Sequence, residues 1–146
     1  METWPKAPID VERNELCFGC GKKNPIGLKL DFKWDGKIAR TRFTPTEFYQ
    51  GWAGMVHGGI LNSILDEAMA YAAIFEGANC ITARMETRIR RPARVGEALL
   101  ITSSVTRKSR KLVNTKASIT LEDGTPVAEG TSSQFIIRAE PGKSRL

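Results

Sequence analysis

Hydrophobic residues recur at steps of three and four positions from Ile60 onward. This set consists of Ile60, Ile64, Leu65, Ala68, Met69, Ala72 and Ala73, with Leu61 beside it. The spacing predicts one helix of about 17 residues that is apolar over half of its circumference. The other half carries Asn62, Ser63, Asp66, Glu67 and Ala70. Two glycines that follow the only histidine, His57, form the entry to this helix.

The predicted helix lies in a stretch without basic residues. No lysine or arginine occurs from Phe43 to Ala83, although the chain has 22 of them. A solvated protein surface normally mixes charges of both signs. We therefore infer that another part of the fold, or a second subunit, covers the polar face of the helix. An acid held there is expected to have a raised pKa, as a general base near neutral pH requires.

Alternating patterns on both sides of the helix predict strands. Apolar residues alternate from Leu28 to Trp34, Asp35-Gly36 is typical of a hairpin turn, and a second strand returns over residues 38–43. After the helix, one alternating set predicts the buried face of a strand, and it consists of Ile81, Ala83, Met85, Thr87 and Ile89. Further strands are expected over residues 97–107, 112–122 and 127–137, with Gly130 as a bulge.

This order of elements indicates an α+β fold. The pattern predicts two strands, then one long helix, then four strands in a meander. We therefore expect an antiparallel sheet of five to six strands that curls around the helix. With 146 residues and 41% hydrophobic content, the chain is long enough for one domain with its own core. We expect that domain to span residues 17–138, between an N-terminal arm (1–16) and a C-terminal tail (139–146).

The composition of the chain bears on its localisation and on metal binding. No apolar run of about 18 residues is present, so no membrane span is expected. The N-terminus lacks the apolar core of a signal peptide, which favours a cytoplasmic protein. Three cysteines favour reduced thiols. A structural zinc site needs four ligands, and the CxxC pair Cys17 and Cys20 supplies two. The remaining candidates, Cys80 and His57, lie at no recognised spacing from that pair, so we expect no metal.

Positive charge is concentrated after the helix. The net charge is +6, and residues 84–116 contain ten basic residues against two acidic ones. Such a concentration favours phosphate groups, whether of a nucleic acid or of a phosphorylated small molecule. The segment has no interleaved aromatic residues and no recognition-helix pattern, so nucleic acid is the weaker candidate.

Several short motifs point to a known family. They are Cys17-Phe18-Gly19-Cys20-Gly21, Asn24-Pro25, Gly27-Leu28, Gly51-Trp52, His57-Gly58-Gly59, Asp66-Glu67-Ala68 and Arg91-Pro92 followed by Val95-Gly96-Glu97. In this order they resemble the hotdog-fold thioesterases of the PaaI-like group over residues 17–138. The resemblance implies hydrolysis of an acyl thioester, usually of coenzyme A, without a cofactor, at the interface of a homodimer or homotetramer.

The resemblance also implies roles for individual residues. The N–H of Gly58, helped by Gly59 and the helix dipole, would polarise the thioester carbonyl. Asp66, nine positions after His57, would activate water or attack the carbonyl directly. His57 would orient the site, and the hydroxyl of Thr82 would position the water. From the residues alone, Asp66 could equally bond a neighbouring loop, His57 could simply cap the helix, and Thr82 could be an ordinary strand residue.

The chain departs from the family in one position. Related enzymes often carry an Asn or Gln six residues before the histidine, where this chain has Gly51 and places the amide one position earlier, at Gln50. Either Gln50 takes over that contact or the contact is missing.

The basic segment supplies candidate ligands for the phosphates of coenzyme A, with ordinary solvated charges as the alternative. These candidates are Arg90, Arg91, Arg94, Arg107, Lys108 and Arg110.

Two other functions stay open from the sequence. A hotdog hydratase or dehydratase usually has a histidine shortly after its aspartate, whereas this chain has its histidine before Asp66. A non-catalytic acyl-CoA sensor or binding module could keep the same acid and glycines as a ligand clamp. In each case, exposed sheet edges and the stretch 43–83, which has no basic residues, predict at least a dimer.

Overall fold

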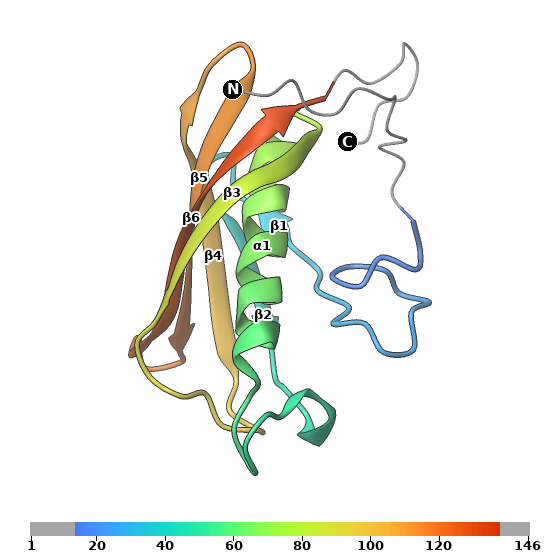
Figure 1. The fold of residues 1–146 in the computed structure, drawn as a ribbon, viewed down its shortest axis with the longest axis vertical. Coiled ribbons are helices and arrows are strands. Elements are labelled where there is room, and N and C mark those ends of the chain that lie inside the picture. The colour runs from blue at the N-terminus through green and yellow to red at the C-terminus, as the bar shows by residue number, and fades with distance from the viewer. Residues whose placement is uncertain (1–13, 138–146) are drawn as a thin grey trace.

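A computed structural model of the chain describes residues 14–137. One long helix, α1 (Gly58–Phe75), packs along one face of a six-stranded antiparallel sheet (Figure 1). The strands are β1 (Lys33–Trp34), β2 (Ala39–Phe43), β3 (Cys80–Ile89), β4 (Leu99–Lys108), β5 (Leu112–Leu121) and β6 (Pro126–Ile136), and a short 3-10 helix, η1, spans Glu47–Tyr49. The predicted α+β hotdog fold is confirmed. The predicted tail 139–146 and most of the predicted arm 1–16 lie outside the described residues.

The strand order corrects one part of the prediction. The sheet runs β1-β2-β4-β5-β6-β3, so β4, β5 and β6 form a meander, but β3 pairs with β6 at the far edge. The outward face of β3 is charged and exposed, and it carries the ion pair between Arg84 and Glu86. A strand of this character suits an edge position, because only one of its sides needs a partner within the sheet.

The apolar stripe of α1 forms the core as predicted. Leu61, Ile64 and Leu65 are buried against sheet residues such as Ile101 and Ile119. Two polar side chains of the sheet also bind backbone carbonyls of the helix. Ser103 Oγ donates to the carbonyl of Ala68, and Gln134 Nε2 donates to that of Met69 at 3.0 Å. The position of α1 along the sheet is therefore fixed by hydrogen bonds as well as by burial.

The segment before β1 is mostly unpaired with the sheet. Leu28, Leu30 and Phe32 are buried in alternation, as the pattern predicts. However, the N–H groups of Leu28 and Leu30 donate to the carbonyls of Phe18 and Gly19, so strand pairing begins only at Lys33. The predicted first strand is too long because a loop, not a strand, satisfies its backbone.

The hairpin between β1 and β2 forms where the sequence predicts it. Gly36 has a φ of 97°, a conformation that glycine adopts without strain. The Asp35 carboxylate accepts the N–H of Ile38, pairs with Arg40 and accepts the N–H of Lys37, and together these contacts lower the pKa of Asp35 to about 2.

A bulge in β3 changes which residues face the helix. The register between β3 and β6 shifts between Thr82 and Arg84, leaving Ala83 unpaired and exposed. Thr82 therefore turns toward α1, and Met85 beyond the bulge packs against the core. The prediction that Ile81 and Ala83 share one buried face with Met85 is wrong, because the extra residue inverts the alternation.

Gly130 is not a bulge. It pairs with Thr87 on one side and Ala117 on the other without a shift in register. A side chain there would lie 3.2 Å from the carbonyl oxygen of Glu86 and 3.4 Å from the side chain of Met69. The glycine thus allows close packing between sheet and helix. Within residues 14–137, no helix has the length and apolar character needed to cross a membrane.

Candidate active site

The start of α1 is capped by the histidine that precedes it. His57 Nδ1 accepts the N–H of Gly59 at 2.8 Å, and the His57 carbonyl accepts those of Ile60 and Leu61. Gly59 is predicted as a second donor to the substrate, but its N–H points to the histidine ring instead. The N–H of Gly58 has no acceptor among residues 14–137. Capping therefore leaves one backbone donor free at the positive end of the helix dipole.

A cleft of about 430 Å³ opens over this donor. It is lined by Gly51, Trp52, Met55, Val56, His57 and Gly58. The side chain of Ile89 approaches Gly58 from the end of β3. Trp52 is 84% exposed and Phe48, from η1, is 86% exposed, so large apolar side chains stand in solvent around the start of the helix.

The loop before His57 explains the missing amide. Gln50 Oε1 accepts the N–H of Gly54 at 2.8 Å, so this side chain braces its own loop. A side chain at Gly51 would start 3.3 Å from Cδ2 of His57 and would crowd the ring. The space that an Asn or Gln would occupy at position 51 is thus partly filled by the capping histidine.

The predicted acid and hydroxyl lie together. Thr82 Oγ1 donates to Asp66 Oδ1 at 2.8 Å, and the pair is partly buried between α1 and β3. The bulge at Ala83 makes this contact possible, because it turns Thr82 toward the helix. Asp66 follows Gly58 by eight residues, which at 1.5 Å per residue separates the two by about 12 Å along the helix axis. The backbone donor and the carboxylate are therefore about two helical turns apart within one protomer.

The basic candidates divide into two groups. The N–H of Val56 donates to the carbonyl of Ala93, and Arg94 forms a β-bridge with Met55, so the loop with Arg91 and Arg94 borders the cleft. The side chain of Arg90 is paired with Glu129.

The other basic group lies near the opposite end of α1. Lys108 Nζ donates to the carbonyl of Glu76, just after the helix ends, and Arg107 and Arg110 flank it in sequence. Because the 18-residue helix is about 27 Å long, the basic segment is not one patch. Its two halves face different ends of the protomer.

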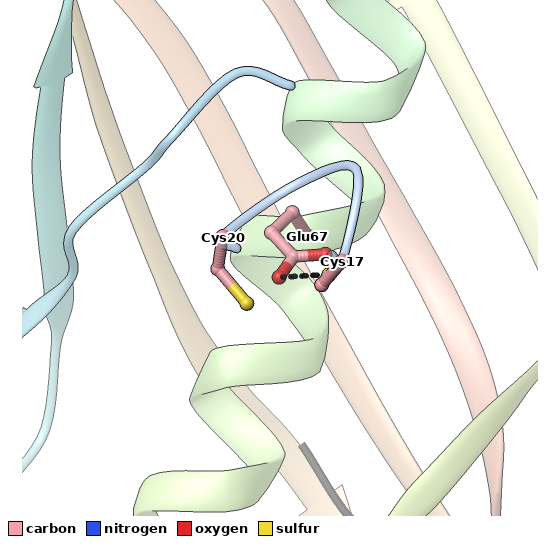
Figure 2. Close-up of side chains that lie close together, drawn as sticks. All are labelled: Cys17, Cys20 and Glu67. Carbon is pink, nitrogen blue, oxygen red and sulfur yellow. Dashed lines mark hydrogen bonds between the residues drawn. The ribbon is translucent and has the colours of Figure 1, made fainter. Parts of the chain in front are cut away.

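A third group of side chains escapes the sequence analysis. Cys17 and Cys20, from the loop before β1, flank Glu67 of α1 (Figure 2). Their ligand atoms all lie within 4.8 Å of one another. Glu67 sits at the margin of the apolar stripe, and nothing in its spacing connects it to the CxxC pair. Only the packing of the loop on the helix brings the three together.

A family model described as the thioesterase superfamily matches residues 53–128. The chain belongs to the thioesterase superfamily. This membership confirms the predicted resemblance and the predicted class of enzyme. A search of curated proteins found no significant match.

Solved structures of other proteins share the fold of this superfamily member. A hypothetical thioesterase with coenzyme A from Streptococcus pneumoniae TIGR4 has a TM-score of 0.70 and 18% identity, over 73% of this chain and 84% of that one. A Streptococcus mutans UA159 protein bound to acetyl-CoA has a TM-score of 0.70 and 18% identity, over 73% and 87%. The Escherichia coli PaaI protein from the phenylacetic acid degradation operon has a TM-score of 0.72 and 24% identity, over 77% and 82%.

Two further structures are of variants of a hypothetical thioesterase from the same pneumococcal strain. In one an aspartate is replaced by alanine, and in the other a threonine sixteen positions later is replaced by alanine. Each has 17% identity and a TM-score of 0.70, over 73% of this chain and 89% or 88% of that one.

The capping role of His57 leads to a stability prediction. Replacing His57 with alanine removes the acceptor for the N–H of Gly59 and should lower the free energy of unfolding by roughly 0.5–2 kcal/mol. His57→Asn keeps a capping acceptor and should recover most of that loss. Urea unfolding of the three proteins measures the difference. Equal stability of wild type and His57→Ala would show that the cap contributes nothing.

Proposed function

We propose that this protein hydrolyses an acyl-CoA to the free acid and coenzyme A, in a site shared by two protomers. The observation that carries the proposal is the hydrogen-bonded pair of Asp66 and Thr82 on the polar face of α1. It gives a thioesterase superfamily member a positioned carboxylate close to a helix-facing hydroxyl. Two related structures, one with coenzyme A and one bound to acetyl-CoA, support the choice of substrate class.

The N–H of Gly58 would bind the thioester oxygen. It is the one capping-region donor without an acceptor in the described chain, and Gly58 lines the cleft at the positive end of α1. As the carbonyl carbon becomes tetrahedral, negative charge grows on its oxygen, and a fixed donor stabilises that charge without reorganisation. Gly59 contributes indirectly, since its N–H holds the His57 ring in place.

Asp66 would act on the other side of the carbonyl. As a base, it takes a proton from water while the water oxygen bonds to the carbonyl carbon. The carbon–sulfur bond then breaks, and the departing thiolate of coenzyme A takes up a proton. As a nucleophile, Asp66 forms an anhydride with the acyl group while the carbon–sulfur bond breaks and the coenzyme A thiolate leaves and takes up a proton. Water then cleaves the anhydride, which releases the acid and restores the carboxylate. The hydroxyl of Thr82 fits both routes, because it orients the carboxylate.

The pneumococcal variants support this pair. The aspartate and threonine replaced in that protein are sixteen positions apart, as are Asp66 and Thr82. The hydratase reading is weaker, because the chain has one histidine and its Nδ1 is engaged in capping α1. No second proton-transfer histidine is therefore available to work beside Asp66.

Two protomers are needed to assemble the site. Gly58 and Asp66 are about 12 Å apart along the axis of one helix, too far for both to contact one carbonyl directly, which favours a donor from one protomer and an acid from the other. The outer side of β3 is a ten-residue edge that a second copy can pair with, and Thr82 lies on this strand. The exposed Phe48 and Trp52 add apolar surface near the start of α1. Pairing of two such edges would bring the Asp66 of one protomer toward the Gly58 of the other.

The arginines beside the cleft would bind the phosphates of coenzyme A. Arg91 and Arg94 lie in the loop that borders the cleft, and guanidinium groups form paired hydrogen bonds to phosphate. Arg90 is held by Glu129 and would have to exchange partners. Arg107, Lys108 and Arg110 lie at the far end of the protomer and can serve this site only from another subunit.

The central prediction concerns the carboxylate. Thiol release from a panel of acyl-CoAs should be detectable for wild type, and Asp66→Asn should lower kcat by roughly 10²- to 10⁴-fold, because it cannot accept the proton or attack. Thr82→Val should lower kcat by about 10-fold, as expected for the loss of one hydrogen bond to a charged group. Asp31→Asn, at an exposed acid before β1, is the matched control and should match wild type. A fully active Asp66→Asn would contradict the proposal.

A second prediction isolates the backbone donor. Gly58→Pro deletes only the N–H, since proline is accommodated at the first position of a helix and the ψ of 135° at His57 suits a residue before proline. We expect kcat to fall by roughly 10²- to 10³-fold. Gly58→Ala keeps the N–H, and its methyl group would meet Ile89 at an ordinary 3.4 Å, so it should lose far less. Similar losses in both variants would assign the effect to shape rather than to the donor.

A third prediction tests the shared site. Asp66→Asn and Gly58→Pro proteins are mixed, unfolded together and refolded. In a mixed dimer one site has both groups intact, so random pairing should restore about a quarter of wild-type activity. Each variant refolded alone supplies the baseline. If both groups act within one protomer, no mixture regains activity.

A further inference from the structure

The cluster of Cys17, Cys20 and Glu67 has the composition of a metal site. Cys17 Sγ lies 3.9 Å from Glu67 Oε1, and all three ligand atoms lie within 4.8 Å of one another. Each residue is partly buried. Figure 2 shows the carboxylate between the two cysteines, with the CxxC loop folded over the helix. These groups are separate from the cleft at the start of α1.

The loop is shaped to hold the two thiols against the carboxylate. A side chain at Gly19 would start 2.4 Å from the Glu67 carboxyl carbon, so glycine leaves room for the carboxylate in its present position. Gly21 donates its N–H to the carbonyl of Cys17 at 2.9 Å, and a side chain there would collide with the Glu15 carbonyl at 2.3 Å. The close approach at Gly21 is to backbone atoms, so a larger residue there would force the turn to shift.

The electrostatics of the cluster favour a cation. Once ionised, two thiols and a carboxylate this close together would carry three negative charges. A divalent cation would neutralise the carboxylate and stabilise both thiolates at once.

We propose that Cys17, Cys20 and Glu67 bind one zinc ion, with water as the fourth ligand. Thiolate sulfur selects zinc over magnesium or calcium, and carboxylate oxygen is a common zinc ligand. In a tetrahedral site the sulfur atoms would be about 3.8 Å apart and sulfur and oxygen about 3.5 Å apart, so no distance in the cluster must shorten by more than about 1.3 Å. Two Zn–S bonds and one Zn–O bond form, and the two thiol protons pass to solvent.

The metal would have a structural role. It would tie the loop before β1 to the middle of α1, one residue after Asp66, and would hold Leu28 and Leu30 against the core through their hydrogen bonds to the loop. The sequence predicts no metal because Cys80 and His57, the other cysteine and the only histidine, lie at no recognised spacing from the CxxC pair. The carboxylate of Glu67 is a ligand that only the fold supplies. The proposal does not depend on the hydrolytic reaction.

The test measures zinc on the reduced full-length chain. Protein purified with a reductant is stripped with a chelator, exposed to Zn²⁺, passed through a desalting column and assayed by mass spectrometry for metal and by a colorimetric assay for free thiols. We expect about one zinc per chain. Cys17→Ser, Cys20→Ser and Glu67→Gln should each retain at least 10-fold less. Cys80→Ser is the matched control and should retain zinc as wild type does.

A second measurement separates coordination from adventitious binding. Co²⁺ added to the stripped protein should give thiolate-to-metal charge-transfer absorption in wild type and Cys80→Ser, and none in Cys17→Ser. Chelator should lower the Tm of zinc-loaded wild type but not that of Glu67→Gln, which keeps the size of the side chain.

Two results would overturn the proposal. One is a reduced wild type that retains no zinc, and the other is zinc that stays bound when Glu67 or either cysteine of the pair is replaced. Loss of two free thiols in metal-free wild type after the reductant is removed and air is admitted, with no zinc retained beforehand, would identify a redox-active Cys17–Cys20 pair instead.

Discussion

The packing of α1 against the sheet is the constraint on which the rest of this structure depends. Burial of Ile64 and Leu65, with hydrogen bonds from Ser103 and Gln134 to helix carbonyls, fixes both the rotation and the axial position of the helix. The position of each functional group of α1 then follows from its place in the helix. The free N–H is at its first turn, the carboxylate two turns further, and Glu67 on the side that meets the CxxC loop.

The sequence predicts the elements that depend on local periodicity. The helix, the hairpin at Asp35-Gly36 and the strands β4 to β6 follow from spacing and turn residues, because those signals are carried by neighbours in the chain. The position of β3 at the edge does not follow, since strand order depends on distant pairing. The length of the first strand is also missed, because Leu28 and Leu30 bond to a loop that has no pattern of its own.

The same distinction between local and distant signals applies to the candidate site. Asp66 and His57 can be picked from a motif of fixed spacing, and the contact between Asp66 and Thr82 is consistent with that choice. The engagement of Gly59 by the histidine ring cannot be read from the motif, because it depends on a single side-chain torsion. The contact of Glu67 with Cys17 and Cys20, which lie 50 and 47 positions earlier, cannot be read from the sequence either. It forms only when the loop folds onto the helix.

The extra residue at Ala83 has an effect beyond aiming one hydroxyl. By inverting the alternation partway along β3, it divides the strand into a short part that serves the helix and a longer part whose outward side chains are charged. Substitutions in the longer part can alter solubility or the surface seen by a second copy without rotating Thr82. Evolution can thus tune assembly and chemistry separately on one continuous strand.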